Sequence, residues 1–229
     1  MGGEDYFIGG MTYISHIAPT AVTLTAFALL PAPFLAGVAL GLGAGIGFYP
    51  AFMAPAWLGY YWNRSDRRWR FLFGFGLTCL SIGIAVLLLS QPSGDRGLVS
   101  TILFDTFGHH TDPRHYGFSP YSFWGQRSGI RGWFNTPVAG TSGLATPMFL
   151  TFVAIAAASF WPARRSSPPQ LALLTAVAAL GASLVKIHQT GTYVAWALPF
   201  LLMGFFADSQ PIADGSSPSD STPSEAGSA

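Results

Sequence analysis

The longest uncharged stretch of this sequence runs from Tyr6 to Asn63 and contains no Asp, Glu, Lys or Arg. A helix needs about 20 apolar residues to cross the hydrocarbon layer of a bilayer, and this stretch is far longer. Half of the 229 residues are hydrophobic and only 9% are charged. This combination predicts an integral membrane protein rather than a soluble domain.

Net charge, cysteine content and the N-terminal sequence argue against several kinds of partner, cross-link and targeting signal. The formal net charge of +1 gives no reason to expect nucleic acid as a partner. The only cysteine, Cys79, lies in an apolar run, so neither an intramolecular disulfide nor a multi-cysteine zinc site is expected. The opening residues MGGEDY are acidic instead of basic, so we expect no cleavable signal peptide. The first span is then expected to act as the membrane signal.

Pro, Gly and charged residues divide the apolar sequence into six candidate spans. We expect an all-α bundle of transmembrane helices at 12–30, 34–61, 71–90, 147–161, 171–187 and 193–206. The second segment is longer than the roughly 20 residues that one span requires, and Gly47, Pro50 and Pro55 interrupt it. It is either one long kinked span, with the N-terminus inside, or a broken hairpin near Pro50, with the N-terminus outside.

Three glycines in this second segment, Gly37, Gly41 and Gly45, fall four residues apart. Glycines at this spacing share one helix face, so a neighbouring helix can approach closely. We expect these residues to serve helix packing.

Two arginine clusters predict the orientation of the bundle. They lie in short connections beside the spans and consist of Arg64, Arg67, Arg68, Arg70, Arg164 and Arg165. The positive-inside rule places both in the cytoplasm. The polar, aromatic loop 91–145 is separated from each arginine cluster by one span and is therefore expected outside, together with Lys186. The acidic, low-complexity tail 208–229 is expected to be disordered in the cytoplasm.

The external loop holds the candidate catalytic residues. Asp105 and Asp112 are candidate general bases, and His110 is a candidate proton carrier near neutral pH. For Asp105 the alternative is a helix cap or an ion pair with an arginine. The pattern HHxDxxH at 109–115 has side chains that suit a divalent metal, but its spacing matches no metal motif and Pro113 disfavours a regular helix. We therefore expect no metal and no other cofactor.

A second group of residues is suited to binding phosphate or a sugar ring. Arginine forks bind phosphate through two hydrogen bonds, and tryptophan stacks on sugars or lies at headgroup level. A lysine or histidine at the mouth of a span is a further candidate. The group consists of Trp124, Gln126, Arg127, Arg131, Lys186, His188 and Tyr193. The alternative is a set of interfacial anchors and ion pairs, with the lysine snorkelling from its helix end.

Two segments resemble GT-C glycosyltransferases, in particular bacterial mannosyltransferases that use polyprenyl phosphate mannose. The first is PAPFLAGVALGLGAGIGFYPAFMAPAWLGYYW followed by the basic NRSDRRWRFLFGF, and the second is TGTYVAWALPFLL. Together they cover about a third of the chain. The lysine or arginine often found before the "YP" of this family is replaced by Gly47 and Phe48.

This resemblance implies an inner-membrane protein that binds a lipid-linked sugar and transfers it with inversion. The general base of the family lies in a first external loop, whereas only Glu4 and Asp5 precede the first span here. The chain therefore looks like the C-terminal portion of such an enzyme, either a fragment, a split subunit or a non-catalytic relative. The alternative is a non-enzymatic membrane subunit whose external aromatic loop docks a partner protein, because arginine and aromatic residues also favour protein contacts.

Overall fold

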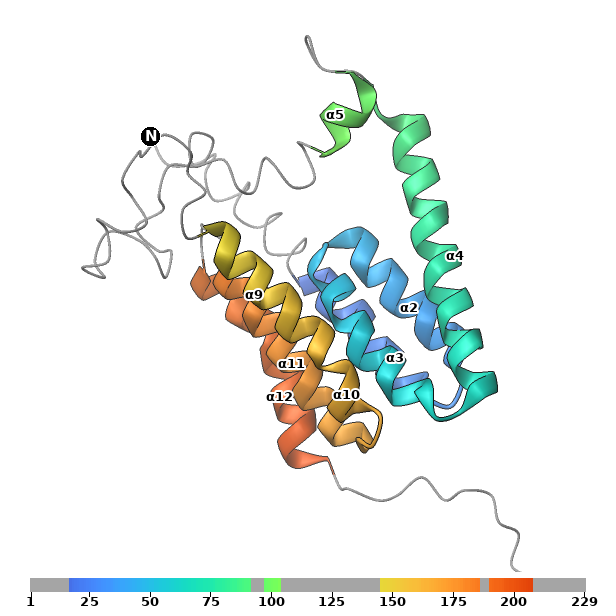
Figure 1. Ribbon diagram of the computed structural model, residues 1–229, viewed down its shortest axis with the longest axis vertical. Coiled ribbons are helices and arrows are strands. Elements are labelled where there is room, and N and C mark those ends of the chain that lie inside the picture. The colour runs from blue at the N-terminus through green and yellow to red at the C-terminus, as the bar shows by residue number, and fades with distance from the viewer. Residues whose placement is uncertain (1–16, 92–96, 104–144, 186–189, 208–229) are drawn as a thin grey trace, which may run out of the picture.

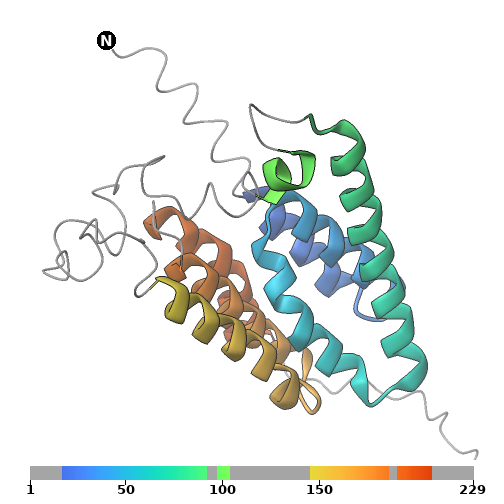
Figure 2. The same ribbon diagram turned by 45° about the horizontal axis from the view of Figure 1, so that its top comes forward.

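The computed structural model describes residues 17–91, 97–103, 145–185 and 190–207. All regular elements within these ranges are helices, and none of the described residues lies in a strand. The expected all-α class is therefore confirmed. Figures 1 and 2 show the helices running alternately up and down in one bundle, with connections gathered at its two ends.

The N-terminal half of the bundle contains the broken hairpin. After the helix Ile17–Ala28, α2 spans Pro33–Ile46, the 3-10 helix η1 spans Tyr49–Met53, and α3 spans Ala54–Trp62. The Tyr61 hydroxyl donates a hydrogen bond to the Leu30 carbonyl, 2.9 Å away, at the connection just before α2. The end of α3 thus returns to the start of α2, so the segment 34–61 is a broken hairpin and not one long kinked helix. The reason lies in two prolines, Pro50 in η1 and Pro55 in the first turn of α3, which prevent a continuous helix.

Helix α4, Ser65–Leu89, packs against α2 through the three glycines spaced four residues apart. A Cβ atom at Gly37 would clash with the Phe71 carbonyl oxygen of α4, and one at Gly41 would lie 2.9 Å from the Thr78 Cβ. Gly74 of α4 meets the α2 backbone in the same way, at the Phe34 carbonyl. The expected packing role of these glycines is confirmed.

The short helix α5, Leu98–Leu103, follows α4, and the C-terminal half of the bundle then contains four helices. They are α9 (Ala145–Ala158), α10 (Phe160–Ala163), α11 (Pro168–Val185) and α12 (Thr190–Phe206). The predicted span 147–161 is therefore two helices. Pro162 explains the break, because its ring clashes with the carbonyl four residues earlier and it has no amide hydrogen to donate.

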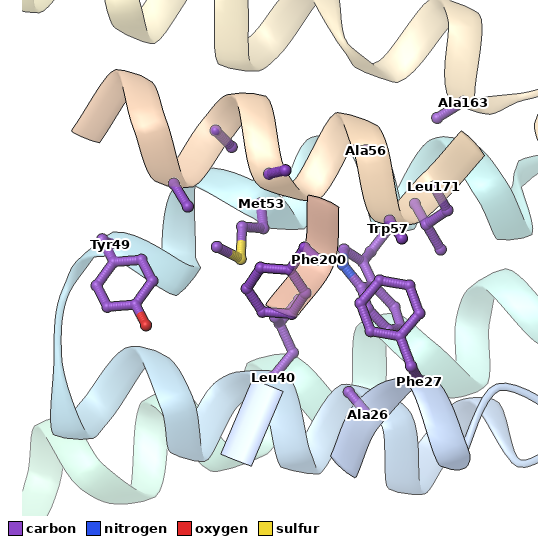
Figure 3. Packing of buried hydrophobic residues seen from close by; sticks show 14 of the residues in the cluster. Ala26, Phe27, Leu40, Tyr49, Met53, Ala56, Trp57, Ala163, Leu171 and Phe200 are labelled. Carbon is purple, nitrogen blue, oxygen red and sulfur yellow. The ribbon is translucent and has the colours of Figure 1, made fainter. Parts of the chain in front are cut away.

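A hydrophobic core joins the two halves of the bundle. Phe27 packs edge-on against Trp57 of α3, with 4.6 Å between ring centroids, and also contacts Phe200 of α12 at 5.8 Å. Figure 3 shows these three rings grouped between the surrounding helices. All three side chains are buried, so they fix the position of α12 against the N-terminal hairpin.

The basic cluster near Arg64 lies in a different element from the one expected. We predicted that its arginines lie in a connection before a span at 71–90, but α4 begins at Ser65 and includes Arg67, Arg68 and Arg70. Asp66 accounts for the early start. Its carboxylate lies in the first turn, where it interacts favourably with the helix dipole, and it forms an ion pair with Arg70 at 2.8 Å.

Helix α4 is the one described helix that is long and apolar enough to cross a membrane by length and composition. Only 6% of its most apolar window is buried. The other apolar helices in the described ranges have 10–17 residues in their described apolar parts. Of the six spans predicted from the sequence, only the one that corresponds to α4 meets this criterion among the described residues.

Candidate functional site

The structure describes very little of the site predicted from the sequence. Tyr193 lies in the first turn of α12. The other nine candidate residues lie outside the described residues; they are Asp105, His110, Asp112, Trp124, Gln126, Arg127, Arg131, Lys186 and His188. The same holds for the metal-type pattern at 109–115, and within the described ranges no three His, Cys, Asp or Glu side chains are grouped to hold a metal ion.

The segments that border these residues lie at one end of the bundle. Helix α5 precedes the loop, α9 follows it, and α11 and α12 flank Lys186 and His188. Figures 1 and 2 show α5, the start of α9 and the start of α12 at the end of the bundle opposite the α3–α4 connection. Element η1 lies at this same end, because it joins the C-terminal end of α2 to the N-terminal end of α3 there (Figure 1). We call it the η1 end.

Tyr49 is the centre of the described side chains at the η1 end. Its ring is buried and stacks on the Trp196 ring of α12, with 3.9 Å between centroids and 8° between planes. Its hydroxyl oxygen lies 2.6 Å from the Thr20 Oγ1 in a buried hydrogen bond. One side chain therefore joins the first helix, η1 and α12.

Two glycines, one in α2 and one in the connection from α2 to η1, allow this part of the chain to lie close to the first helix. A Cβ atom at Gly43 would be 2.8 Å from the Thr23 Oγ1, and one at Gly47 would be 2.8 Å from the Pro19 Cγ. The Thr23 hydroxyl donates to the Pro19 carbonyl at 2.7 Å, so the packed interface leaves this buried hydroxyl satisfied.

An aromatic row connects η1 to α9. Phe52 contacts Phe48 edge-on at 6.2 Å and Phe152 of α9 at 4.8 Å. Among the described residues no Asp, Glu, Lys or Arg lies at this end. The described part of the η1 end thus offers aromatic faces and hydroxyl groups, and any acid, base or cation for chemistry must come from residues beyond it.

The reasoning from sequence missed the roles of Tyr49, Trp196 and Thr20. It favoured the charged residues of the external loop, whereas these three lie in uncharged helical segments. Two signals were present: Tyr49 adjoins Pro50 at the break of the hairpin, and Trp196 belongs to TGTYVAWALPFLL, the second segment of the family resemblance.

The sequence matches no protein-family model, and comparison with curated proteins and with solved structures finds no match.

Proposed function

We propose that this chain is part of a GT-C-type membrane glycosyltransferase that takes its sugar from a polyprenyl phosphate at the η1 end. The observation that carries the proposal is the stack of Tyr49 on Trp196 at 3.9 Å. Each of the two segments that resemble the family contributes one of these rings, although they lie far apart in the sequence. Their meeting beside the attachment points of the external loop supports a shared site.

The distribution of charge and apolar surface supports a membrane location. Within the described ranges, every Asp, Glu, Lys and Arg lies in 64–70 or at 164–165. The flank of α4 is apolar and open, with Phe73, Leu80 and Leu88 exposed by 66%, 61% and 79%. A bilayer would cover this flank, and α4 with its 25 residues is about 38 Å long, enough to cross it.

The orientation follows from the two ends of the bundle. The Asn63 Nδ2 donates to the Arg164 carbonyl at 3.0 Å, so the two arginine clusters lie at one end. The positive-inside rule assigns this end to the cytoplasm and the η1 end to the outer face. The helix Ile17–Ala28 begins at the η1 end, where Thr20 meets Tyr49, so its N-terminal end faces outside.

The proposed reaction needs a base, a donor and a stabilised leaving group. Asp105 or Asp112 removes the proton of an acceptor hydroxyl, whose oxygen bonds to the anomeric carbon as the bond from that carbon to the phosphate oxygen breaks. Arg127, Arg131 and Lys186 stabilise the departing polyprenyl phosphate. The sugar is transferred with inversion, and no metal or other cofactor takes part.

The remaining candidates have binding roles in this proposal. Trp124 and Tyr193 offer aromatic rings to the sugar, and Gln126 and His188 offer hydrogen bonds to its hydroxyl groups. His110 carries the proton between the base and solvent.

Binding of polyprenyl phosphate to the purified chain in lipid nanodiscs tests the proposal. We expect saturable binding that Arg127→Ala and Lys186→Ala each weaken about tenfold, because each removes a cation from the phosphate. Arg165→Ala removes the same charge at the opposite end and serves as the matched control with unchanged affinity. Absence of saturable binding, or equal loss in all three variants, contradicts the proposal.

A non-enzymatic membrane subunit is the second candidate function. It is favoured by the absence of acidic and basic residues among those described at the η1 end. In that case the external loop docks a partner protein through Trp124 and Trp133. Stable co-purification of another chain, lost on replacing either tryptophan by alanine, would support this function.

A further inference from the structure

The end of the bundle opposite η1 carries a strong concentration of positive charge. All six arginines of the described residues are found there, against the single carboxylate of Asp66. Asp66 is already engaged by Arg70 at 2.8 Å. None of the remaining arginines forms an ion pair with a carboxylate of the described residues, and an external anion is the natural counter-charge. We call this surface the arginine end.

The arginine end is assembled from two connections distant in sequence. Asn63 joins them, because its Nδ2 donates to the Arg164 carbonyl at 3.0 Å and its Oδ1 accepts from the Arg164 Nη2 at 3.4 Å. Beneath this contact, Gly59 of α3 lies against the Phe160 carbonyl so closely that no Cβ atom would fit. The helices thus hold the two arginine clusters beside one another.

Arg68 is the best-positioned cation of this surface. Its guanidinium lies over the Trp62 ring, 5.0 Å from the centroid, and 5.4 Å from the Trp69 centroid. The Nε atom is buried and has no hydrogen-bond partner. The aromatic contacts orient the guanidinium without using the hydrogen-bond donors of its two terminal nitrogens, so these donors are left for a ligand.

Two exposed tryptophans border the arginine end. The side chain of Trp69 is 63% exposed, and that of Trp161 is 67% exposed. Tryptophan at the edge of an apolar bundle favours the headgroup layer, where one side meets acyl chains and the other meets water. The cations of the arginine end therefore lie at headgroup depth in a bilayer.

We propose that the arginine end binds the phosphate group of an anionic phospholipid, with Arg68 and Arg164 as its main contacts. The inference rests on the membrane location proposed above but not on sugar transfer. A free phosphate ion has the same chemistry, but the two bordering tryptophans and the apolar flank of α4 favour a phosphate that carries acyl chains.

The test measures lipid binding to the full chain in neutral detergent by native mass spectrometry. Dioleoylphosphatidylglycerol is expected to bind at least tenfold more tightly than dioleoylphosphatidylcholine, and the difference should shrink as salt is raised. Arg68→Gln and Arg164→Gln should each weaken phosphatidylglycerol binding five- to tenfold, or about 1 kcal/mol. Arg70→Gln removes the same charge from an arginine already paired with Asp66 and should change binding less than twofold.

Several outcomes would overturn the inference. Equal affinity for the two lipids would show that the arginine end has no site for an anionic headgroup. An Arg70→Gln effect as large as that of Arg68→Gln would show that binding depends on total charge and not on Arg68. Competition by inorganic phosphate at low millimolar concentration would assign the site to the free ion. If Arg68→Gln lowers helicity, the exposed Arg164→Gln on a separate connection decides the question. Polyprenyl phosphate binding in Arg68→Gln should stay unchanged, so the two proposals can fail separately.

Discussion

Tyr49 joins three segments of the chain through one ring and one hydroxyl group. The ring stacks on Trp196, and the hydroxyl oxygen lies 2.6 Å from the Thr20 Oγ1. Both contacts are buried, so neither competes with water in the folded state. The position of η1 against the first helix and α12 therefore depends on this residue.

Replacing the two hydroxyl partners separately and together tests this dependence. Tyr49→Phe and Thr20→Val each remove one side of a buried hydrogen bond and should lower the free energy of unfolding by about 1–2 kcal/mol. The double variant should lose less than the sum, with a coupling of about 1 kcal/mol, because the second change breaks no further bond. Thermal or denaturant unfolding in detergent measures all three, and strictly additive losses would contradict the hydrogen bond.

Helices α2 and α4 pack closely against each other. The Phe75 amide nitrogen of α4 lies 2.8 Å from the position that a Cβ atom at Gly37 would occupy. A backbone atom cannot rotate away as a side-chain end can. The glycine at this position is therefore required by the spacing of the two helices.

A pair of glycine substitutions tests this requirement. Gly37→Ala should lower the free energy of unfolding by about 1–3 kcal/mol, because the added methyl group overpacks the interface. Gly76→Ala on α4 is the matched control, since nothing lies within 4 Å of its added Cβ and alanine is the better helix former. The control should be neutral or stabilising by up to about 1 kcal/mol. Equal destabilisation of both variants would show that the close contact is not the cause.

Periodic and apolar patterns predicted the helices well, whereas helix ends and side-chain partners needed the folded structure. The spacing of Gly37, Gly41 and Gly45 predicted a packing face because it depends on helix geometry alone. The start of α4 at Ser65 was missed, because Asp66 and Arg70 stabilise a turn whose residues are too polar for a hydropathy pattern. The stack of Tyr49 on Trp196 joins distant segments, and no local pattern predicts such a pair.

At the scale of the whole molecule, the charged residues of the described ranges lie at one end and the aromatic η1 end lies at the other. Between these ends the helices present apolar side chains outward, most of all on α4. This arrangement fits a bundle that crosses a bilayer with the arginine end inside and the proposed sugar-transfer site outside. Both proposals in this account depend on that placement.

Cysteine accessibility in intact cells tests this placement most directly. In a Cys79→Ser background, Ser100→Cys places a thiol on the exposed face of α5 at the η1 end, and Ser65→Cys places one at the arginine end. A membrane-impermeant maleimide should label Ser100→Cys in intact cells, and Ser65→Cys only after the membrane is opened. Labelling of Ser65→Cys in intact cells, or recovery of both variants in the soluble fraction, would contradict the account.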